Sequence, residues 1–114
     1  MSEPAARSVL EAGLAREGLS PSAWSNAAGD VYGEHRHAYD KVLVAVEGSI
    51  TFHLRELRRD VELRVGDRLD LPAHTLHGAT VGPRGVTCLE AHLPAGSLAA
   101  EPRHIPAGWA DEPA

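Results

Sequence analysis

The sequence predicts an all-β domain, either a sandwich or a barrel, with one short helix on its N-terminal side. Between residues 23 and 93 the chain consists of short apolar or alternating runs separated by Gly, Pro and Asp, which is typical of all-β domains. Val42 to Val46 is apolar on both faces of the expected strand, which indicates a central strand covered on both sides. With 114 residues the chain has the length of one domain with one core.

The helix is expected at residues 8–18, where Leu10 and Leu14 lie four positions apart and therefore on one face. Ser8 and Glu11 have the spacing of a capping box, in which two side chains bind free backbone N–H groups at the start of a helix. A glycine then stands where a left-handed residue commonly ends a helix. Together these signals predict a short amphipathic helix in front of the β region.

Eight strands are expected after the helix, each bounded by turn residues. They lie at residues 23–27, 30–37, 40–47, 49–55, 60–64, 68–71, 76–81 and 86–93. The apolar residues expected to form the core are Val42, Leu43, Val44, Val46, Ile50, Phe52, Leu69 and Leu71. Residues 82–85 read Gly-Pro-Arg-Gly and are expected to form a turn. The tail, residues 94–114, carries four prolines among alanines and glycines, so it cannot form a helix or a central strand of any length.

Composition and charge argue against several classes of partner. The net charge is −5, with eleven basic and sixteen acidic residues and no basic run, which offers no surface for nucleic acid or an anionic membrane. The one cysteine, Cys88, excludes an internal disulfide and suits a reducing compartment. No apolar stretch approaches the length of a membrane span, and the first residues lack the layout of a signal peptide. We therefore expect a cytoplasmic protein with no nucleic-acid and no membrane partner.

The main functional signal is the pair His35 and His37, followed forty residues later by His77 just past a proline turn. Residues i and i+2 of a strand point to the same side, so the first two imidazoles can aim at one point. The third would come from a distant strand. Three neutral imidazoles can hold a transition metal and leave coordination positions open for chemistry. The pattern favours a metal site, although an H-x-H pair can also result from surface alternation.

Two stretches of the chain resemble the motifs of one protein family. Residues 29–48 are similar to the first cupin motif, G-x5-H-x-H-x3-4-E-x6-G, and residues 66–81 resemble the second, G-x5-P-x-G-x2-H-x3-N. The two stretches stand in the right order with a short segment between them. The resemblance implies that residues 1–114 are a single cupin domain, whose jelly-roll barrel spans residues 23–93. It also implies one divalent transition metal (Fe, Mn, Ni or Zn) in the barrel mouth, and often a homodimer that shares strands.

The chain departs from the motifs at three positions. Lys41 stands where the family has its glutamate ligand, His74 replaces the second glycine of the second motif, and Val81 replaces its asparagine. Only the three histidine ligands, His35, His37 and His77, therefore carry over.

A protonated lysine has no lone pair and is repelled by a metal ion. At 4 Å, one charge against two costs about 8 kcal/mol at an effective dielectric near 20. Three interpretations of Lys41 follow: it holds an anionic substrate, it pairs with a carboxylate such as Asp40 or Glu90, or the site contains no metal.

Three further residues are candidates for the site. His74 could be a fourth metal ligand or line the mouth as a substrate contact and proton shuttle, although a surface histidine on a turn is the simpler interpretation. Glu90 could face inward as a general base or as the ion-pair partner of Lys41, although burial alone would place it outside. Tyr39, with Trp24 and Tyr32, could line the mouth, and Tyr39 is the aromatic residue best placed to meet a substrate.

These residues favour a small metal-dependent enzyme, similar to dioxygenases, isomerases or decarboxylases, that acts on a small anionic organic substrate. Lys41 and Glu90 would be its catalytic side chains, and Tyr39, His74 and Lys41 would contact the substrate. Two alternatives stay open: a non-catalytic module that binds or senses a small molecule, and a purely structural dimeric barrel.

Overall fold

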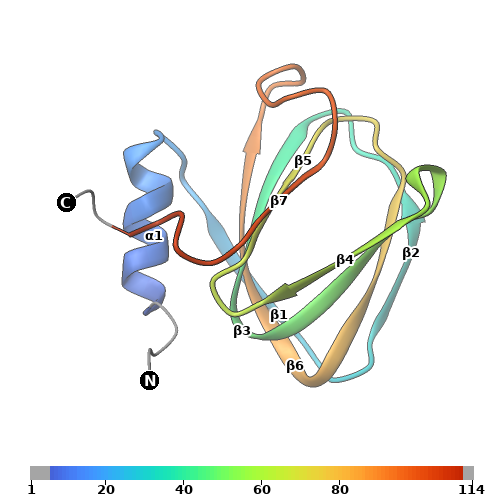
Figure 1. The fold of residues 1–114 in the computed structure, drawn as a ribbon, viewed down its shortest axis with the longest axis horizontal. Coiled ribbons are helices and arrows are strands. Elements are labelled where there is room, and N and C mark those ends of the chain that lie inside the picture. The colour runs from blue at the N-terminus through green and yellow to red at the C-terminus, as the bar shows by residue number, and fades with distance from the viewer. Residues whose placement is uncertain (1–5, 112–114) are drawn as a thin grey trace.

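A computed structural model describes residues 6–111 of the chain, in which one antiparallel sheet rolls up beside a single α-helix (Figure 1). Its elements are α1 (Arg7–Arg16), β1 (Ser22–Asn26), β2 (Val31–His35), β3 (Asp40–Leu54), the 3-10 turn η1 (Arg55–Leu57), β4 (Arg59–Arg64), β5 (Arg68–Leu71), β6 (His77–Leu93) and β7 (Arg103–Ile105). The prediction of an all-β barrel with one short helix on its N-terminal side is confirmed. No helix within residues 6–111 is long and apolar enough to cross a membrane.

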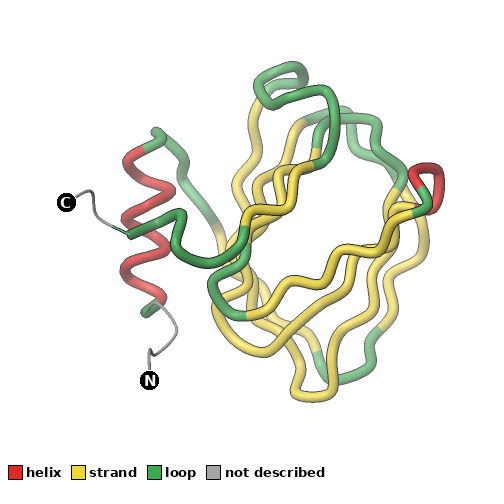
Figure 2. The backbone as a smooth tube through the Cα atoms, in the orientation of Figure 1, coloured by secondary structure: helices red, strands yellow, loops and turns green. Residues whose placement is uncertain are grey.

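Two long strands, β3 and β6, pair with each other along most of their length and carry the rest of the sheet. The other edge of β3 pairs directly with two strands, with β5 along its first part and with β4 along its last part. The other edge of β6 pairs with β2 along its first part and with β1 along its later part. The strand β7 extends the sheet beyond β5. Because the two long strands bend together, the sheet rolls up into a barrel-like shape, as the backbone tube shows (Figure 2).

The continuity of β3 and β6 differs from the prediction of four shorter strands. Residues 82–85 form a bulge on β6, since they lie opposite Ser49 alone, between the pairs Gly48–Val86 and Ile50–Val81. A Cβ on Gly48 would lie 1.9 Å from the carbonyl oxygen of Gly85, and Gly48 has φ +65°. Glycine is therefore required where the two strands bend past each other, and the turn signal marks a bend instead of a chain reversal.

Two apolar clusters pack on opposite faces of the sheet. Alternate residues of β3 belong to different clusters: Leu43 points into the barrel, whereas Val42 and Val44 point to the outer face under α1. The prediction that Val42 to Val46 is covered on both faces is confirmed, and all eight predicted core residues are buried. The outer cluster contains Leu10, Leu14, Val42, Val44, Val46, Leu89, Ala91 and Ala110.

The predicted capping box of α1 is wrong. The helix begins at Arg7, one residue before the predicted start, and its N-cap residue Ala6 makes no side-chain hydrogen bond. Ser8 therefore lies inside the first turn, and Glu11 pairs with Arg7 at 3.4 Å along the helix surface. Packing of Leu10 and Leu14 on the sheet holds the helix in place.

The tail contributes a short edge strand, β7, that the sequence analysis did not predict. It pairs with β5 over three residues, which its prolines permit because an edge strand needs few ladder hydrogen bonds. Beyond it, the Trp109 indole donates to the Gly66 carbonyl at 2.8 Å, and the Arg68 guanidinium lies 4.9 Å from the centre of the Trp109 ring. The tail therefore closes the outer cluster against the barrel.

Candidate metal site and adjoining pocket

Three histidine rings meet at one end of the barrel. His35 is the last residue of β2 and pairs in register with His77, the first residue of β6, while His37 follows two residues after β2 ends. The ring centres of His35 and His77 lie 4.4 Å apart, those of His35 and His37 4.7 Å, and those of His37 and His77 5.2 Å. One nitrogen from each ring lies within 4.8 Å of the others, so this group could hold a metal ion.

Hydrogen bonds set which nitrogen of each ring is free. Nδ1 of His35 lies 2.8 Å from the Gly33 carbonyl oxygen, and Nδ1 of His77 lies 2.8 Å from the Thr75 carbonyl oxygen. A carbonyl can only accept, so both Nδ1 atoms carry the proton and both Nε2 atoms keep a lone pair. The His37 Nε2 is buried and has no hydrogen-bond partner within the described part of the chain. A metal ion would remove the cost of that unpaired atom, so the three residues fit a metal.

Burial keeps two of these imidazoles, those of His37 and His77, neutral. His77 is 3% exposed, and burial lowers its pKa to about 4, with smaller contributions from its neighbours. The pKa of His37 is also lowered, first by burial and then by the positive charge of Lys41. Near neutral pH both rings therefore offer the uncharged form that binds metal ions.

The two loops that carry the histidines are tied together by their backbones. The His74 backbone N–H donates to the His37 carbonyl at 2.7 Å, and Arg36 donates to the His74 carbonyl at 2.9 Å while it pairs with Glu56. These bonds hold the His37 segment against the turn that precedes His77. Sequence reasoning did not identify Arg36, because its role depends on partners twenty and thirty-eight residues away.

The structure gives no support to His74 as a fourth ligand. Its backbone bridges the two loops in a left-handed conformation, φ +67°, and its side chain is exposed. It is absent both from the histidine group and from the residues that line the adjoining pocket. The His74 side chain therefore takes part neither in the histidine group nor in the pocket of this structure.

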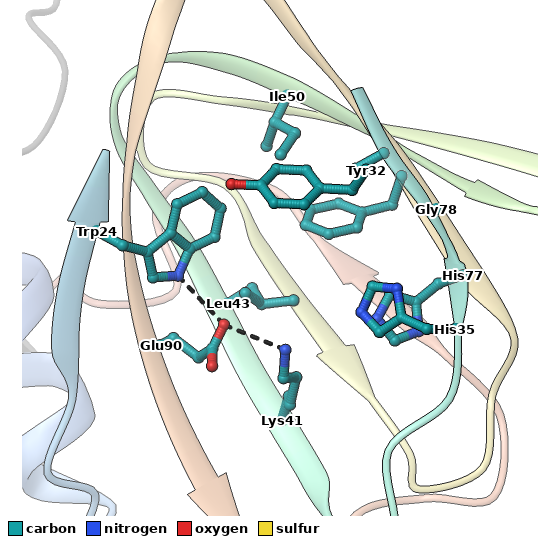
Figure 3. A pocket seen from close by; sticks show the side chains of 11 residues that line it. Trp24, Tyr32, His35, Lys41, Leu43, Ile50, His77, Gly78 and Glu90 are labelled. Carbon is teal, nitrogen blue, oxygen red and sulfur yellow. Dashed lines mark hydrogen bonds and ion pairs between the residues drawn. The ribbon is translucent and has the colours of Figure 1, made fainter. Parts of the chain in front are cut away.

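A pocket of about 250 Å³ adjoins the histidines inside the barrel (Figure 3). Its lining consists of Trp24, Tyr32, His35, Lys41, Leu43, Ile50, Phe52, His77, Gly78, Ala79 and Glu90. In Figure 3 Trp24 lies on one side of the space, His35 and His77 lie on the other, and the Tyr32 ring lies above it. Trp24 and Tyr32 pack edge to face, with ring centres 6.1 Å apart, so the mouth-lining role predicted for both agrees with their positions.

Lys41 and Glu90 form an ion pair in the pocket wall. The Lys41 Nζ lies 3.3 Å from Glu90 Oε1, and the two side chains are 11% and 15% exposed. The same Oε1 accepts a hydrogen bond from the Trp24 indole at 3.1 Å, and His92 Nε2 lies 2.5 Å from Oε2. Of the two carboxylates predicted as partners of Lys41, the structure selects Glu90.

The donors around Glu90 keep its carboxylate ionised. Burial would raise the pKa of Glu90, but the hydrogen bond with His92 and the charge of Lys41 outweigh it, so the pKa lies below its ordinary value. Glu90 points inward because it shares the strand face of Cys88, which belongs to the inner cluster, whereas Leu89 and Ala91 belong to the outer one. Both faces of β6 are covered, so the apolar alternation of this strand does not mark its inner face.

Asp40, the first residue of β3, binds two loops outside the pocket. It is 1% exposed and accepts hydrogen bonds from the backbone N–H groups of Ala73 and Leu98, both at 2.7 Å. Burial would raise its pKa, but these backbone hydrogen bonds lower it below the ordinary value. Asp40 therefore anchors two loops and takes no part in the pocket.

Tyr39 does not line the pocket and so differs from the substrate contact predicted for it. Its ring lies between those of His37 and His92, at centre distances of 4.9 Å and 4.3 Å. The sequence gives His92 a weaker claim to the site than the other histidines, although it shares a strand face with Glu90. Cys88 is fully buried, and burial raises the pKa of its thiol to about 12, so it is a neutral core residue.

No family model matches the sequence, and no curated protein is significantly similar to it. Solved structures are similar in fold. A cupin superfamily protein from Desulfitobacterium hafniense aligns with a TM-score of 0.58 and 22% identity over 67% of each chain. A DMSP lyase structure aligns with a TM-score of 0.60 and 27% identity over 75% of this chain and 43% of the lyase. Oxalate decarboxylase from Bacillus subtilis, described with Mn(II) centres, aligns with a TM-score of 0.57 and 19% identity over 71% of this chain and 22% of that protein.

Proposed function

Because this chain has the cupin fold, with three histidines beside an internal lysine–glutamate pair, we propose that it is a metal-dependent enzyme for a small anionic organic substrate. Dioxygenase, isomerase and decarboxylase reactions are the classes in view, because a metal ion can support each of them on an anionic substrate, as a Lewis acid or by activating dioxygen. One observation carries the proposal: the free nitrogens of three imidazoles converge next to a pocket that contains a cation able to bind an anion.

The metal would be held by His35, His37 and His77, and when bound it would supply a Lewis acid that polarises a substrate oxygen. Three imidazoles suit Fe, Mn, Ni and Zn alike, and the Mn(II) of oxalate decarboxylase makes manganese the first ion to test. Lys41 would bind the negative charge of the substrate. The apolar side chains of the pocket would exclude water and so strengthen that interaction.

A second candidate is a binding or sensing module without catalysis, and one observation favours it. The Glu90 carboxylate already contacts three donors, from Trp24, Lys41 and His92. A carboxylate so well satisfied is a weak general base. In that case the lysine and the metal would hold a small acid without converting it.

The first test is metal binding by protein purified without a histidine tag. We expect about one equivalent of divalent metal per chain in the wild type and none in His77→Ala, with an unchanged β-type circular dichroism spectrum. His74→Ala is the matched control, because its side chain lies outside the group, and it should keep full metal content. Full loading of His77→Ala would overturn the ligand assignment.

Turnover separates the two candidate functions. The metal-loaded protein is incubated with a panel of small carboxylic acids, with and without dioxygen, and the products are analysed by mass spectrometry. Conversion that is lost in His77→Ala supports the enzyme. Saturable binding of an acid without any conversion supports the binding module.

A further inference from the structure

The pocket beside the histidines has an apolar side and an ionic end. The apolar side is formed by Trp24, Tyr32, Leu43, Ile50 and Phe52. The ionic end is the pair of Lys41 and Glu90, which lies below Trp24 and Tyr32 in Figure 3, with Lys41 on the side of the histidines. An anion without an apolar body would leave the aromatic side chains in contact with water, so a ligand with both parts suits this pocket best.

The size of the pocket limits the apolar part. Its volume of about 250 Å³ is below the range of roughly 300–1,000 Å³ that is usual for drug-sized ligands. The space therefore suits a body of about one ring. The edge-to-face pair of Trp24 and Tyr32 offers such a body aromatic contacts.

The ionic end has unused hydrogen-bond donors. The Glu90 carboxylate is shared among Lys41, Trp24 and His92, so both of its oxygens have donors. The Lys41 ammonium carries three N–H donors, and among residues 6–111 Glu90 is its only ion-pair partner. The end of the pocket can therefore donate to an added acceptor more readily than it can accept from an added donor.

We infer that the pocket binds a monocarboxylate of about the size of benzoate, with its carboxylate on Lys41 and its apolar body against Trp24 and Tyr32. The inference rests on the proposed function, because it takes this pocket as the substrate site. A carboxylate can use the free donors of Lys41 and also face the metal group. A neutral amide of the same shape would bring N–H groups to an end that already has surplus donors.

Calorimetric titration of the wild-type protein tests the inference with three probes. Benzoate carries both parts, benzamide lacks the charge, and acetate lacks the ring. We expect saturable binding of benzoate and at least about tenfold weaker binding of each of the other two. Benzamide or acetate binding as tightly as benzoate, or no saturable benzoate binding at millimolar concentration, would overturn it.

Variants locate the binding. The double variant Lys41→Met with Glu90→Gln removes the pair without leaving an unpaired buried charge, and it should lose the preference for benzoate over benzamide. Arg84→Met is the matched control, because it removes an exposed positive charge from the bulge, and it should bind benzoate as the wild type does. A double variant that keeps the preference would place the carboxylate elsewhere.

Repeating the titration with metal-loaded and chelated protein separates the two proposals. Benzoate binding in a protein that takes up no metal supports the ligand class and contradicts the metal-dependent enzyme. Metal uptake with turnover of acids that lack an apolar body supports the enzyme and contradicts the ligand class.

Discussion

At the scale of single residues, Lys41 decides the chemistry of this pocket, and its behaviour depends on Glu90. A lysine beside a group suited to a divalent ion would be strongly repelled without a compensating carboxylate. Glu90 supplies that charge at 3.3 Å from a neighbouring strand. The pair is almost withdrawn from solvent, so removal of either partner leaves the charge of the other uncompensated.

Glu90→Gln should therefore destabilise the protein by about 3 kcal/mol, because it leaves the Lys41 charge in the barrel without its partner. The measurement is the free energy of unfolding from urea titration at neutral pH. Glu62→Gln is the control, because its pair with Arg64 is 49% and 78% exposed and should contribute less than about 1 kcal/mol. Equal urea midpoints for the two variants would contradict a buried pair.

Single residues also show the limit of what the sequence can predict about the site. His35, His37 and His77 could be found because their spacing within the two motifs is specific. The inward position of Glu90 could not be deduced from alternation, because both faces of β6 are covered and apolar. Strand alternation places His92 on the same face as Glu90, but it does not predict that the imidazole contacts the carboxylate.

At the scale of elements, α1 acts as a cover for the outer face of the sheet. Its residue Gly13 lies so close to the tail that an added Cβ would be 2.7 Å from the Cβ of Ala110 and 3.0 Å from the Trp109 ring. The helix can therefore pack this closely against the tail only because Gly13 has no side chain.

Gly13→Ala should lower the free energy of unfolding by about 1 kcal/mol, although alanine favours helix over glycine by about the same amount. Overpacking of this kind typically costs 1–3 kcal/mol, so the steric cost exceeds the gain in helix propensity. Urea titration measures the change.

The double variant Gly13→Ala with Ala110→Gly removes the opposing Cβ and should recover most of the loss. A Gly13→Ala variant more stable than the wild type would show that the helix does not press on the tail.

Asp40 joins two loops to the start of β3, and its lowered pKa predicts a pH effect. The free carboxyl titrates near pH 4, and the folded one titrates lower. The stabilisation is therefore complete above about pH 4 and is lost as the pH falls through the folded pKa. Asp40→Asn should be less stable than the wild type at neutral pH, and the difference should shrink below about pH 4.

Urea titrations at several pH values measure the Asp40→Asn effect. Asp60→Asn is the control, because that side chain is 69% exposed, and it should change the stability by less than about 1 kcal/mol. A difference between wild type and Asp40→Asn that is independent of pH would contradict an ionised anchor.

Elements were predictable where a local pattern determines them. The apolar spacing in α1 and the double-sided apolar run in β3 both gave correct elements. The joining of the predicted strands into β3 and β6 was not predictable, because glycine and proline at residues 82–85 mark a bulge and a chain reversal equally well. β7 was missed because its pairing with β5 depends on long-range contact.

At the scale of the whole molecule, the histidine group connects segments that are forty residues apart in the chain. His35 ends β2, which pairs with β6 alone within the described residues, His37 follows two residues later, and His77 begins β6. A bound ion would therefore join the edge of the sheet to its central strand. Because such an ion binds the folded chain, it stabilises the fold by mass action.

Metal added at one hundred times its dissociation constant should stabilise the fold by about 2.7 kcal/mol, which corresponds to an increase in Tm of roughly 10 °C. Thermal melts by circular dichroism, with metal and with chelator, measure the increase. His77→Ala should melt at one temperature under both conditions. An equal increase in that variant would mean that the ion binds elsewhere.

The two tryptophans stand in separate parts of this architecture, Trp24 beside the pocket and Trp109 in the outer cluster under α1. Their fluorescence consequently carries two independent signals. With Trp109 replaced by phenylalanine, the remaining indole would report events inside the barrel alone. With Trp24 replaced, emission would follow the docking of the tail, so loosening of the molecule's periphery could be told apart from changes at its centre.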